Sequence, residues 1–407
     1  MLAALGPVSF WFEAPVVGSH WAVVAFVDLA ILLTVATTRD RVRVERQLIP
    51  VARWALIGFY SFAAFAKLNH AFFTPKVSCA TYYLDELAKS MHVTLHSQSG
   101  ASWATVVPIA VAAIELSVPI LLLVPRTRHI GVLVGIVFHG VIAVDQTHLF
   151  ADFSSVLDAL FLLFLPATFA TYVFGQVRQL SSEGQERLRA FVILGAAILL
   201  AMQLYGRSDQ VTRFFFDGQG WAWVSYDVAL VVLVISFSRA QHPEPIEHPL
   251  RFGPAGLPMW LAILPALVIL NGLSPYLELR TAYGFNMYSN LRTANGESNH
   301  LLITRTLPLT DYQSDLIRVV ATSDPGLAMY VDSGFEIPFL QFRDYMSRHR
   351  DASVTYVRKG VEHRLARADE DPAVVESVPP WQSKLFAFRS LDDTGPTRCQ
   401  PGILPAL

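Results

Sequence analysis

The chain has 407 residues, of which 53% are hydrophobic and 16% are charged, and its formal net charge is -2 at pH 7. Its mean hydropathy of +0.41 is high for a soluble globular domain and indicates a polytopic membrane protein. The arginines lie between apolar runs and form no basic cluster, which argues against nucleic-acid binding.

Apolar runs long enough to cross a bilayer recur as far as residue 274. Runs of roughly 17 to 25 residues predict about eight transmembrane helices. They fall at residues 20–38, 49–70, 102–124, 129–147, 150–174, 189–206, 220–238 and 257–274. Asp227 interrupts the seventh run, whereas Pro258 and Pro265 in the eighth are tolerable where neighbouring helices satisfy the freed carbonyls. We therefore expect an α-helical transmembrane bundle over residues 1–274.

Lysine and arginine are unevenly distributed among the connections between these runs. The loops after the odd-numbered runs carry most of the basic residues, including Arg39, Arg41, Arg126 and Arg178. Because basic loops are retained in the cytoplasm, these loops are expected inside the cell. The predicted location is the plasma (inner) membrane, with extracytoplasmic N- and C-termini.

The composition changes after residue 274, where prolines and charged residues become frequent. This change marks a water-exposed domain over residues 275–407, which the predicted topology places outside the membrane. Alternating stretches at 300–306, 316–322 and 353–358 predict strands, and 337–349 predicts a short helix. We expect a small α+β or β-rich domain that ends in a proline-rich tail over 395–407.

The chain has two cysteines, Cys79 and Cys399, and the predicted topology places both on the oxidising side. They can form a disulfide or remain two free thiols, and the sequence leaves both alternatives open. His92 and His96 have the spacing of helical metal ligands, but a solvated amphipathic helix explains them better. No metal site is expected.

Lys67 lies near the end of the second apolar run, where a buried ammonium is costly and requires a reason. In one interpretation, the side chain extends to the lipid headgroups. In the other, the amine faces a neighbouring helix, because Tyr60, Ala63 and Ala64 share its helical face and small residues favour helix contact. A dry pocket would favour the neutral amine, a usable general base, whereas a partner carboxylate would keep the amine protonated.

Polar residues of other runs offer neighbours for this lysine. His139 shares a helical face with Gly131 and Gly135, a pattern typical of a closely packed helix with one hydrogen-bonded histidine. Three acidic residues are candidate counter-charges for Lys67, namely Glu115, Asp145 and Asp152. Glu115 and Asp158 are expected to point into the bundle.

Two segments resemble the HTTM domain, the membrane core of vitamin K-dependent γ-carboxylases and their bacterial relatives. They are residues 59–80, FYSFAAFAKLNHAFFTPKVSCA, and 138–166, FHGVIAVDQTHLFADFSSVLDALFLLFLP. The matching positions are the Lys67–Leu68, Phe138–His139, Leu149–Phe150 and Phe153–Ser154 pairs. The resemblance covers approximately residues 1–175, and the later helices agree only in character.

The resemblance implies a specific chemistry at Lys67. In that chemistry Lys67 acts as base on a reduced naphthoquinone, a vitamin K-type quinol, and oxygen adds. The resulting strong base abstracts a carbon-bound proton, and carbon dioxide adds to the carbanion. His139 would be a hydrogen-bonding residue of the catalytic pocket. The expected quinol-binding residues are Tyr60, Phe138, Phe150, Phe153 and Ser154.

The compact outer segment departs from the vertebrate enzymes, whose extended lumenal region recruits the substrate. Glutamate carboxylation is therefore in doubt, and we expect quinol-dependent oxidation, epoxidation or related carboxylase-type chemistry, with a peptide or protein substrate at the outer domain. The competing hypothesis is a non-enzymatic membrane scaffold for toxin maturation, immunity or partner assembly, in which Lys67 and His139 tie helices together. A transporter is disfavoured, because no pair of Gly/Pro-interrupted helices recurs in matching halves.

Overall fold

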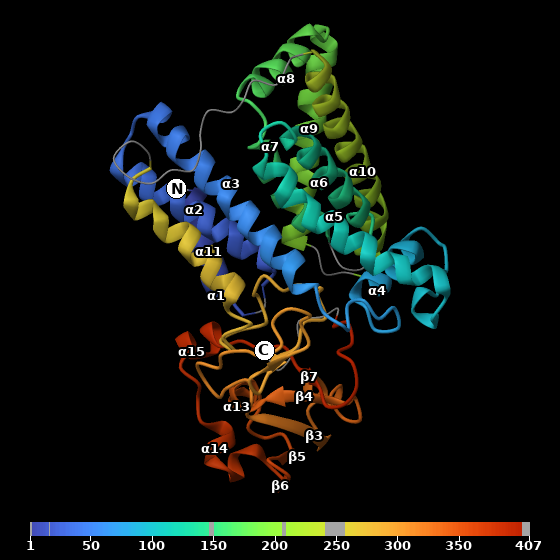
Figure 1. Cartoon of the computed structure of the whole chain (residues 1–407), viewed down its shortest axis with the longest axis vertical. Coiled ribbons are helices and arrows are strands. Elements are labelled where there is room, and N and C mark those ends of the chain that lie inside the picture. The colour runs from blue at the N-terminus through green and yellow to red at the C-terminus, as the bar shows by residue number, and fades with distance from the viewer. Residues whose placement is uncertain (1, 16, 146–149, 206–208, 241–256, 401–407) are drawn as a thin grey trace. The chain divides into compact units, whose positions relative to one another are not determined.

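The computed structural model describes residues 2–15, 17–145, 150–205, 209–240 and 257–400 (Figure 1). It divides the chain into two compact units, each described by itself below. The first unit comprises Met1–Asp85, Thr94–Leu116 and Leu250–Leu407, and the second comprises Glu86–Val93 and Ser117–Pro249. The division into units does not coincide with the domain boundary expected at residue 274.

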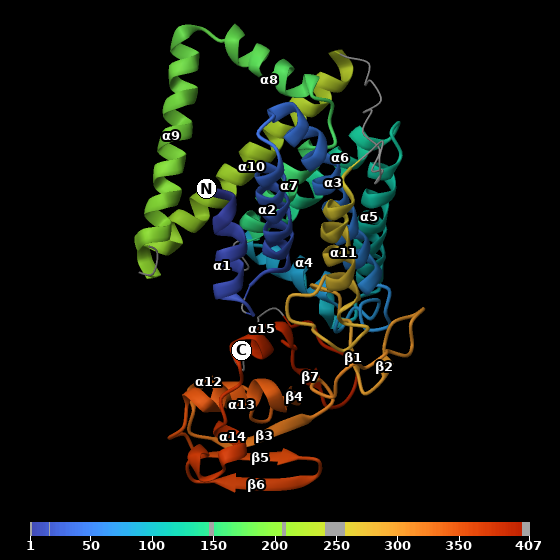
Figure 2. The ribbon, with the colours of Figure 1, turned by 90° about the vertical axis from the view of Figure 1, so that its left-hand side faces the viewer.

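Three helices pack together in the first unit: α2 (Ser19–Thr37), α3 (Arg41–Ala66) and α11 (Ile263–Leu273) (Figure 2). Asp40 begins α3 as its N-cap, since its side chain accepts a hydrogen bond from the amide of Val42. The other helices before residue 274 that lie wholly or partly in this unit are η1 (Leu2–Ala4), α1 (Leu5–Glu13), α4 (Cys79–Ser90), η2 (Ser97–Ser99), η3 (Ser102–Thr105), α5 (Val106–Leu123) and η4 (Met259–Ala262).

A glycine permits the close approach of α3 and α11. A Cβ added at Gly272 of α11 would lie 2.1 Å from a ring carbon of Phe62 on α3. Because that distance is far below van der Waals contact, a larger residue there would push the two helices apart. The contact holds α3, which carries Lys67 at its end, against α11.

The second unit is built from helices. They are α6 (Arg128–Ile142), α7 (Phe150–Leu162), α8 (Thr168–Gln179), α9 (Ser182–Tyr205) and α10 (Asp209–Ala240). Helix α6 packs against both α7 and α10. Gly135 of α6 leaves room for the ring of Phe161 on α7, since a Cβ at Gly135 would lie 2.3 Å from that ring.

Four helices in the described ranges are long and apolar enough to cross a membrane: Ser19–Thr37, Val42–Ala66, Ser102–Leu123 and Trp223–Ala240. They correspond to the first, second, third and seventh expected spans, so the expected count of about eight is not supported. The fourth and eighth runs form shorter apolar helices, Arg128–Ile142 and Met259–Leu273. The fifth run is divided between α7 and α8 around Pro166, whose nitrogen cannot donate a helical hydrogen bond.

The C-terminal part of the first unit contains a five-stranded antiparallel sheet with strand order β6-β5-β3-β4-β7. Its strands are β3 (Leu316–Thr322), β4 (Phe335–Pro338), β5 (Val354–Arg358), β6 (Val361–Leu365) and β7 (Leu391–Asp392). Lys359 and Gly360 connect β5 to β6 as a two-residue turn, and both have positive φ, which suits the twist of a hairpin. A second, two-stranded sheet pairs β1 (Thr293–Ala294) with β2 (Glu297–Ser298).

The strands expected at 316–322 and 353–358 form as β3 and β5, and the helix expected at 337–349 forms as α13 (Phe339–Arg348). The strand expected at 300–306 was wrong. That stretch is irregular, and its pairing is limited to isolated bridges at His300 and Arg305. The remaining short helices are α12 (Pro325–Ala328), η5 (Ala368–Glu370), α14 (Pro372–Val375) and α15 (Pro380–Leu385). Of the proline-rich tail, residues 401–407 lie outside the described residues.

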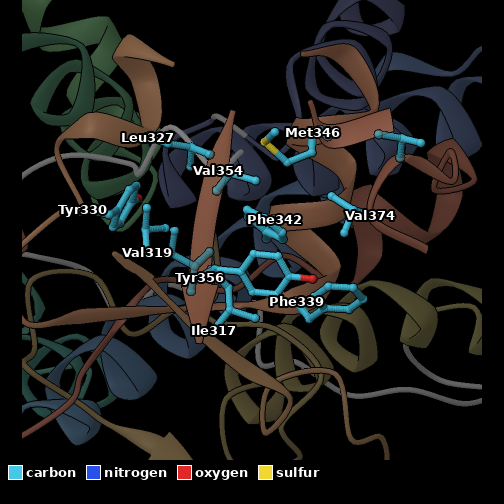
Figure 3. Packing of buried hydrophobic residues seen from close by; sticks show 13 residues of the cluster. Ile317, Val319, Leu327, Tyr330, Phe339, Phe342, Met346, Val354, Tyr356 and Val374 are labelled. Carbon is cyan, nitrogen blue, oxygen red and sulfur yellow. The ribbon is translucent and has the colours of Figure 1, made fainter. Parts of the chain in front are cut away.

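The core of the five-stranded sheet lies between its strands and α13 (Figure 3). Phe342 of α13 and Tyr356 of β5 are fully buried, and their ring centroids are 5.0 Å apart. Ile317 and Val319 of β3 and Met346 of α13 complete the centre of this cluster. Burying each such side chain contributes about 1.5–3 kcal/mol, so the five-stranded sheet has a hydrophobic core of its own.

Asp324 provides a test of pH-dependent stability in this region. Its carboxylate caps α12 by accepting from the amide of Leu327 at 2.9 Å and also accepts from the Tyr345 hydroxyl at 2.7 Å. Burial acts to raise the pKa of Asp324, but these hydrogen bonds and the nearby His349 lower the pKa by more. The carboxylate therefore stabilises the fold above the unfolded pKa of about 3.9, and this contribution is lost as the pH falls through the lower folded value.

We expect Asp324→Ala to lower the free energy of unfolding by about 1–2 kcal/mol at neutral pH, the usual range for a lost N-cap. The midpoint of thermal unfolding, measured from pH 7 down to acid, should fall less steeply in this variant than in the wild type. Tyr345→Phe is the matched control, because it removes one hydrogen bond and leaves the cap. A variant whose pH profile matches that of the wild type would contradict the assignment.

Candidate functional site

Lys67 lies at the C-cap of α3, where its side chain is only 4% exposed. Its Nζ is 2.8 Å from Oε2 of Glu115, a residue of α5 whose side chain is 12% exposed. The amine also donates to the backbone carbonyls of Ala63 at 3.4 Å and Met287 at 3.3 Å. The ammonium is thus enclosed by protein, which contradicts the interpretation that it extends to the lipid headgroups.

Asn69 fixes the backbone just after this lysine. The asparagine is fully buried, and its Nδ2 donates to the carbonyls of Ala66 at 2.8 Å and Ser289 at 2.6 Å. Its Oδ1 accepts from the amide of Phe72 at 2.9 Å. The side chain therefore satisfies a carbonyl at the end of α3 and joins this helix to a loop more than 200 residues later in the chain.

His300 makes a second connection between α3 and the residues that follow α11. Its Nδ1 lies 3.1 Å from the amides of Leu302 and Ile303, which donate to it, and its Nε2 lies 2.8 Å from the carbonyl oxygen of Phe65. This network assigns the neutral tautomer with the proton on Nε2. Burial lowers the pKa of His300, and the hydrogen bond to the Phe65 carbonyl opposes that effect. His300 therefore contributes as a neutral hydrogen-bonding residue.

Tyr60 is also buried, and it lies two helical turns before Lys67 on α3. The neighbouring Phe59 packs edge-on against Phe285, with ring centroids 5.1 Å apart. Tyr60, Lys67 and Glu115 all belong to the first unit, where Lys67 and Glu115 form an ion pair.

The other expected site residues belong to the second unit. His139 of α6 is buried, and its ring packs edge-on against Phe138 and Phe153 at centroid distances of 5.5 and 4.9 Å. The Ser154 hydroxyl donates to the backbone carbonyl of His139 at 3.0 Å. Phe150 is buried at the start of α7. These residues form an aromatic cluster around one imidazole.

The two remaining counter-charge candidates differ in exposure. Asp145 is buried near the end of α6, whereas Asp152 is exposed in the first turn of α7. The Asp152 carboxylate accepts from the amide of Phe153 at 2.7 Å. Both residues lie in the second unit, and Glu115 is the candidate that the structure pairs with Lys67.

The second unit also contains a buried pair of acids, Asp158 of α7 and Asp227 of α10. Both residues are almost fully buried, and their carboxyl groups interact with each other. The sequence signalled each acid separately, as a polar residue within an apolar run, but did not predict the pairing.

Comparison with known proteins adds no relative. No family model, no curated protein and no solved structure matches the chain. The fold itself indicates the class: a mostly helical membrane protein with four helices of membrane-spanning length among the described residues and a small β-sheet region.

Proposed function

We propose that the chain is an integral membrane enzyme of the vitamin K-dependent carboxylase-like (HTTM) type, with Lys67 as general base. The observation that supports the proposal is the buried Lys67–Glu115 pair, with 2.8 Å between Nζ and Oε2, inside a segment that resembles the HTTM domain. In this proposal the protein lies in the inner membrane of a bacterium, with both termini outside.

A base must be able to release its proton before it takes another. In this proposal one proton passes from the Lys67 ammonium to the Glu115 carboxylate, which leaves a neutral amine and a neutral carboxyl group. Glu115 would hold that proton while the Lys67 amine accepts one from a substrate hydroxyl. The two side chains would then work as one proton-exchanging unit.

Two residues of the first unit have side chains that suit a quinol. The amine of Lys67 would accept a proton from a quinol hydroxyl, and Tyr60 on the same helix offers an aromatic ring. In the second unit, the residues that the resemblance to the HTTM domain implies for quinol binding are His139, Phe138, Phe150, Phe153 and Ser154. When bound, the quinol would supply the reducing equivalents: one quinol and one dioxygen give one quinone epoxide and one water.

A second candidate function, a non-enzymatic membrane scaffold, has support from the same contacts. The Lys67 amine binds Glu115 of α5 and the carbonyl of Met287 while its own backbone ends α3, so it joins three segments of the first unit. A purely structural lysine would make such contacts. The scaffold hypothesis predicts stability effects at Lys67 and no quinone chemistry.

The double variant Lys67→Met with Glu115→Leu separates the two hypotheses, because it removes both charges and leaves neither group unpaired. We expect it to accumulate and fold like the wild type while losing quinol-dependent oxygen uptake and any naphthoquinone found in co-purified lipids by mass spectrometry. Lys89→Met is the matched control, since Lys89 pairs with Glu86 at an exposed position. Oxygen uptake by this control should equal that of the wild type.

Wild-type protein that is folded but neither consumes oxygen with a naphthoquinol nor retains a naphthoquinone would contradict the enzyme proposal and favour the scaffold. Oxygen uptake that persists in the double variant would exclude Lys67 as the base.

A further inference from the structure

A polar cleft in the first unit lies apart from the Lys67 pair. It is partly open to solvent and lies between the loop after α11 and the end of the chain. The residues used in the argument are Cys79, Thr293, Gln313, Arg389, Ser390 and Gln400. We call this site the Arg389 cleft.

Polar atoms without a protein partner line the Arg389 cleft. They are Thr293 Oγ1, Gln313 Oε1, Arg389 Nε, Ser390 Oγ and Gln400 Oε1. Thr293, Gln313 and Ser390 are at most 3% exposed. Buried polar atoms are almost always hydrogen-bonded in native proteins, so five unpaired atoms around one cleft point to a polar ligand.

The positive charge of Arg389 indicates that the ligand carries a negative charge. No carboxylate pairs with Arg389 within the described part of the chain, whereas Arg398, which also lines the cleft, is paired with Asp392 at 2.5 Å. Burial lowers the pKa of Arg389, and the Tyr288 and Tyr83 side chains oppose that effect. An arginine cannot shed its charge in a protein, so a group of opposite charge must complete the cleft.

The walls of the cleft are fixed by covalent and hydrogen bonds. Cys79 and Cys399 form a disulfide, and the amide of Cys79 donates to Oδ1 of Asn290 at 2.8 Å. The Asn290 Nδ2 in turn donates to the carbonyls of Val77 at 2.9 Å and Thr397 at 3.0 Å. A site held in this way loses little conformational entropy when a ligand binds.

We infer that the Arg389 cleft binds a carboxylate group that carries an N–H or O–H donor beside it. The planar guanidinium would donate two parallel hydrogen bonds to the two oxygens of the carboxylate. The hydroxyls of Ser390 and Thr293 would also donate to the carboxylate. Gln313 Oε1 and Gln400 Oε1 would accept from the adjacent donor. Both a small hydroxy acid or amino acid and the C-terminal end of a peptide carry this chemistry. The inference is independent of quinol chemistry at Lys67.

Thermal-shift and calorimetric titrations of the full chain in detergent test the inference. The probes are lactate, N-acetylglycine, trialanine with a free C-terminus, and the amides of the last two. We expect at least one free acid to bind and raise the unfolding midpoint, and its amide to have no effect. Binding of lactate or N-acetylglycine alone identifies a free acid as the ligand, and binding of trialanine alone identifies a peptide end.

Arg389→Gln keeps the size and hydrogen bonding of the side chain but removes its charge, and should weaken acid binding roughly ten- to hundredfold, as expected for a lost charge-assisted bond. Arg364→Gln, at an exposed strand position, is the matched control and should bind like the wild type. Ser390→Ala leaves every charge in place and should weaken binding severalfold, which keeps a second variant available if Arg389→Gln does not fold. Equal binding of acid and amide, no binding of any probe, or unchanged binding in Arg389→Gln would overturn the inference.

Discussion

Glu115→Gln should lower the free energy of unfolding by about 3–5 kcal/mol, the usual cost of breaking a buried ion pair. The substitution removes the negative charge beside the Lys67 ammonium, which is 4% exposed, and leaves neutral acceptors: the new amide oxygen and the carbonyls of Ala63 and Met287. Carbonyl dipoles compensate a buried charge much less than a carboxylate at 2.8 Å does. The measurement is reversible denaturant unfolding of the full chain in detergent micelles.

The interpretation depends on comparison with a variant that removes both charges. Lys67→Met combined with Glu115→Leu should lie within about 1 kcal/mol of the wild type or above it, because apolar groups of similar volume often replace a buried pair without loss. Lys89→Met removes the ammonium of a side chain that is 60% exposed and should cost about 1 kcal/mol or less. If Glu115→Gln and Lys89→Met have equal effects, the Lys67–Glu115 pair is not a buried electrostatic contact.

Removal of the disulfide should also lower the free energy of unfolding substantially. Cys79 and Cys399 are 320 residues apart in sequence, so their bond restricts the unfolded chain over most of its length. Replacing both cysteines by serine should lower the free energy of unfolding by about 2–5 kcal/mol. The same loss should follow when the wild type is treated with a reductant, and electrophoretic mobility without reductant reports whether the bond has formed in cells.

Hydrogen bonds around the disulfide supply the control for this prediction. Asn290 connects the same two segments through Val77 and Thr397, and the amide of Cys399 donates to the Val77 carbonyl at 3.0 Å. Asn290→Ala in the oxidised protein should therefore cost less than loss of the disulfide. An unfolding midpoint that is the same with and without reductant would show that these hydrogen bonds suffice.

Local patterns in the sequence predict two strands of the five-stranded sheet, because alternation of apolar and polar residues is a local property. The stretches 316–322 and 353–358 alternate and form β3 and β5. The stretch 300–306 also alternates, but its hydrogen bonds go to scattered partners: His300 meets the Phe65 carbonyl of α3, and the amide of Thr306 donates to the carbonyl of Gly296. A pattern of side chains therefore indicates a strand only where a neighbouring backbone is available to pair with it.

The count of membrane spans could not be predicted from hydropathy alone. A hydropathy window reports composition and does not detect where a helix ends, so it treats 150–174 as one run although the helix stops at Leu162, before Pro166. The fourth and eighth runs are apolar but form helices of fewer than eighteen residues. Helix length depends on turns and packing that hydropathy does not contain.

The sequence directed attention to Lys67 because a cation within an apolar run is conspicuous, and it named Glu115 among three candidate partners. It could not single out Glu115, since the pairing depends on how α3 and α5 face each other. Asn69 and Arg389 were missed for a related reason. The partners of Asn69 include Ser289, 220 residues away, and the importance of Arg389 arises because no carboxylate of the described residues pairs with it.

The contacts that end α3 have a consequence for how the protein is made. The Lys67 amine donates to the carbonyl of Met287, and the Asn69 side-chain amide donates to the carbonyl of Ser289. The carbonyl of Phe65 accepts from His300. A ribosome must therefore translate more than 200 further codons after Asn69 before these groups meet their acceptors. Until then the nascent chain carries unsatisfied polar groups at the end of α3, where chaperones and membrane proteases can recognise an unfinished protein.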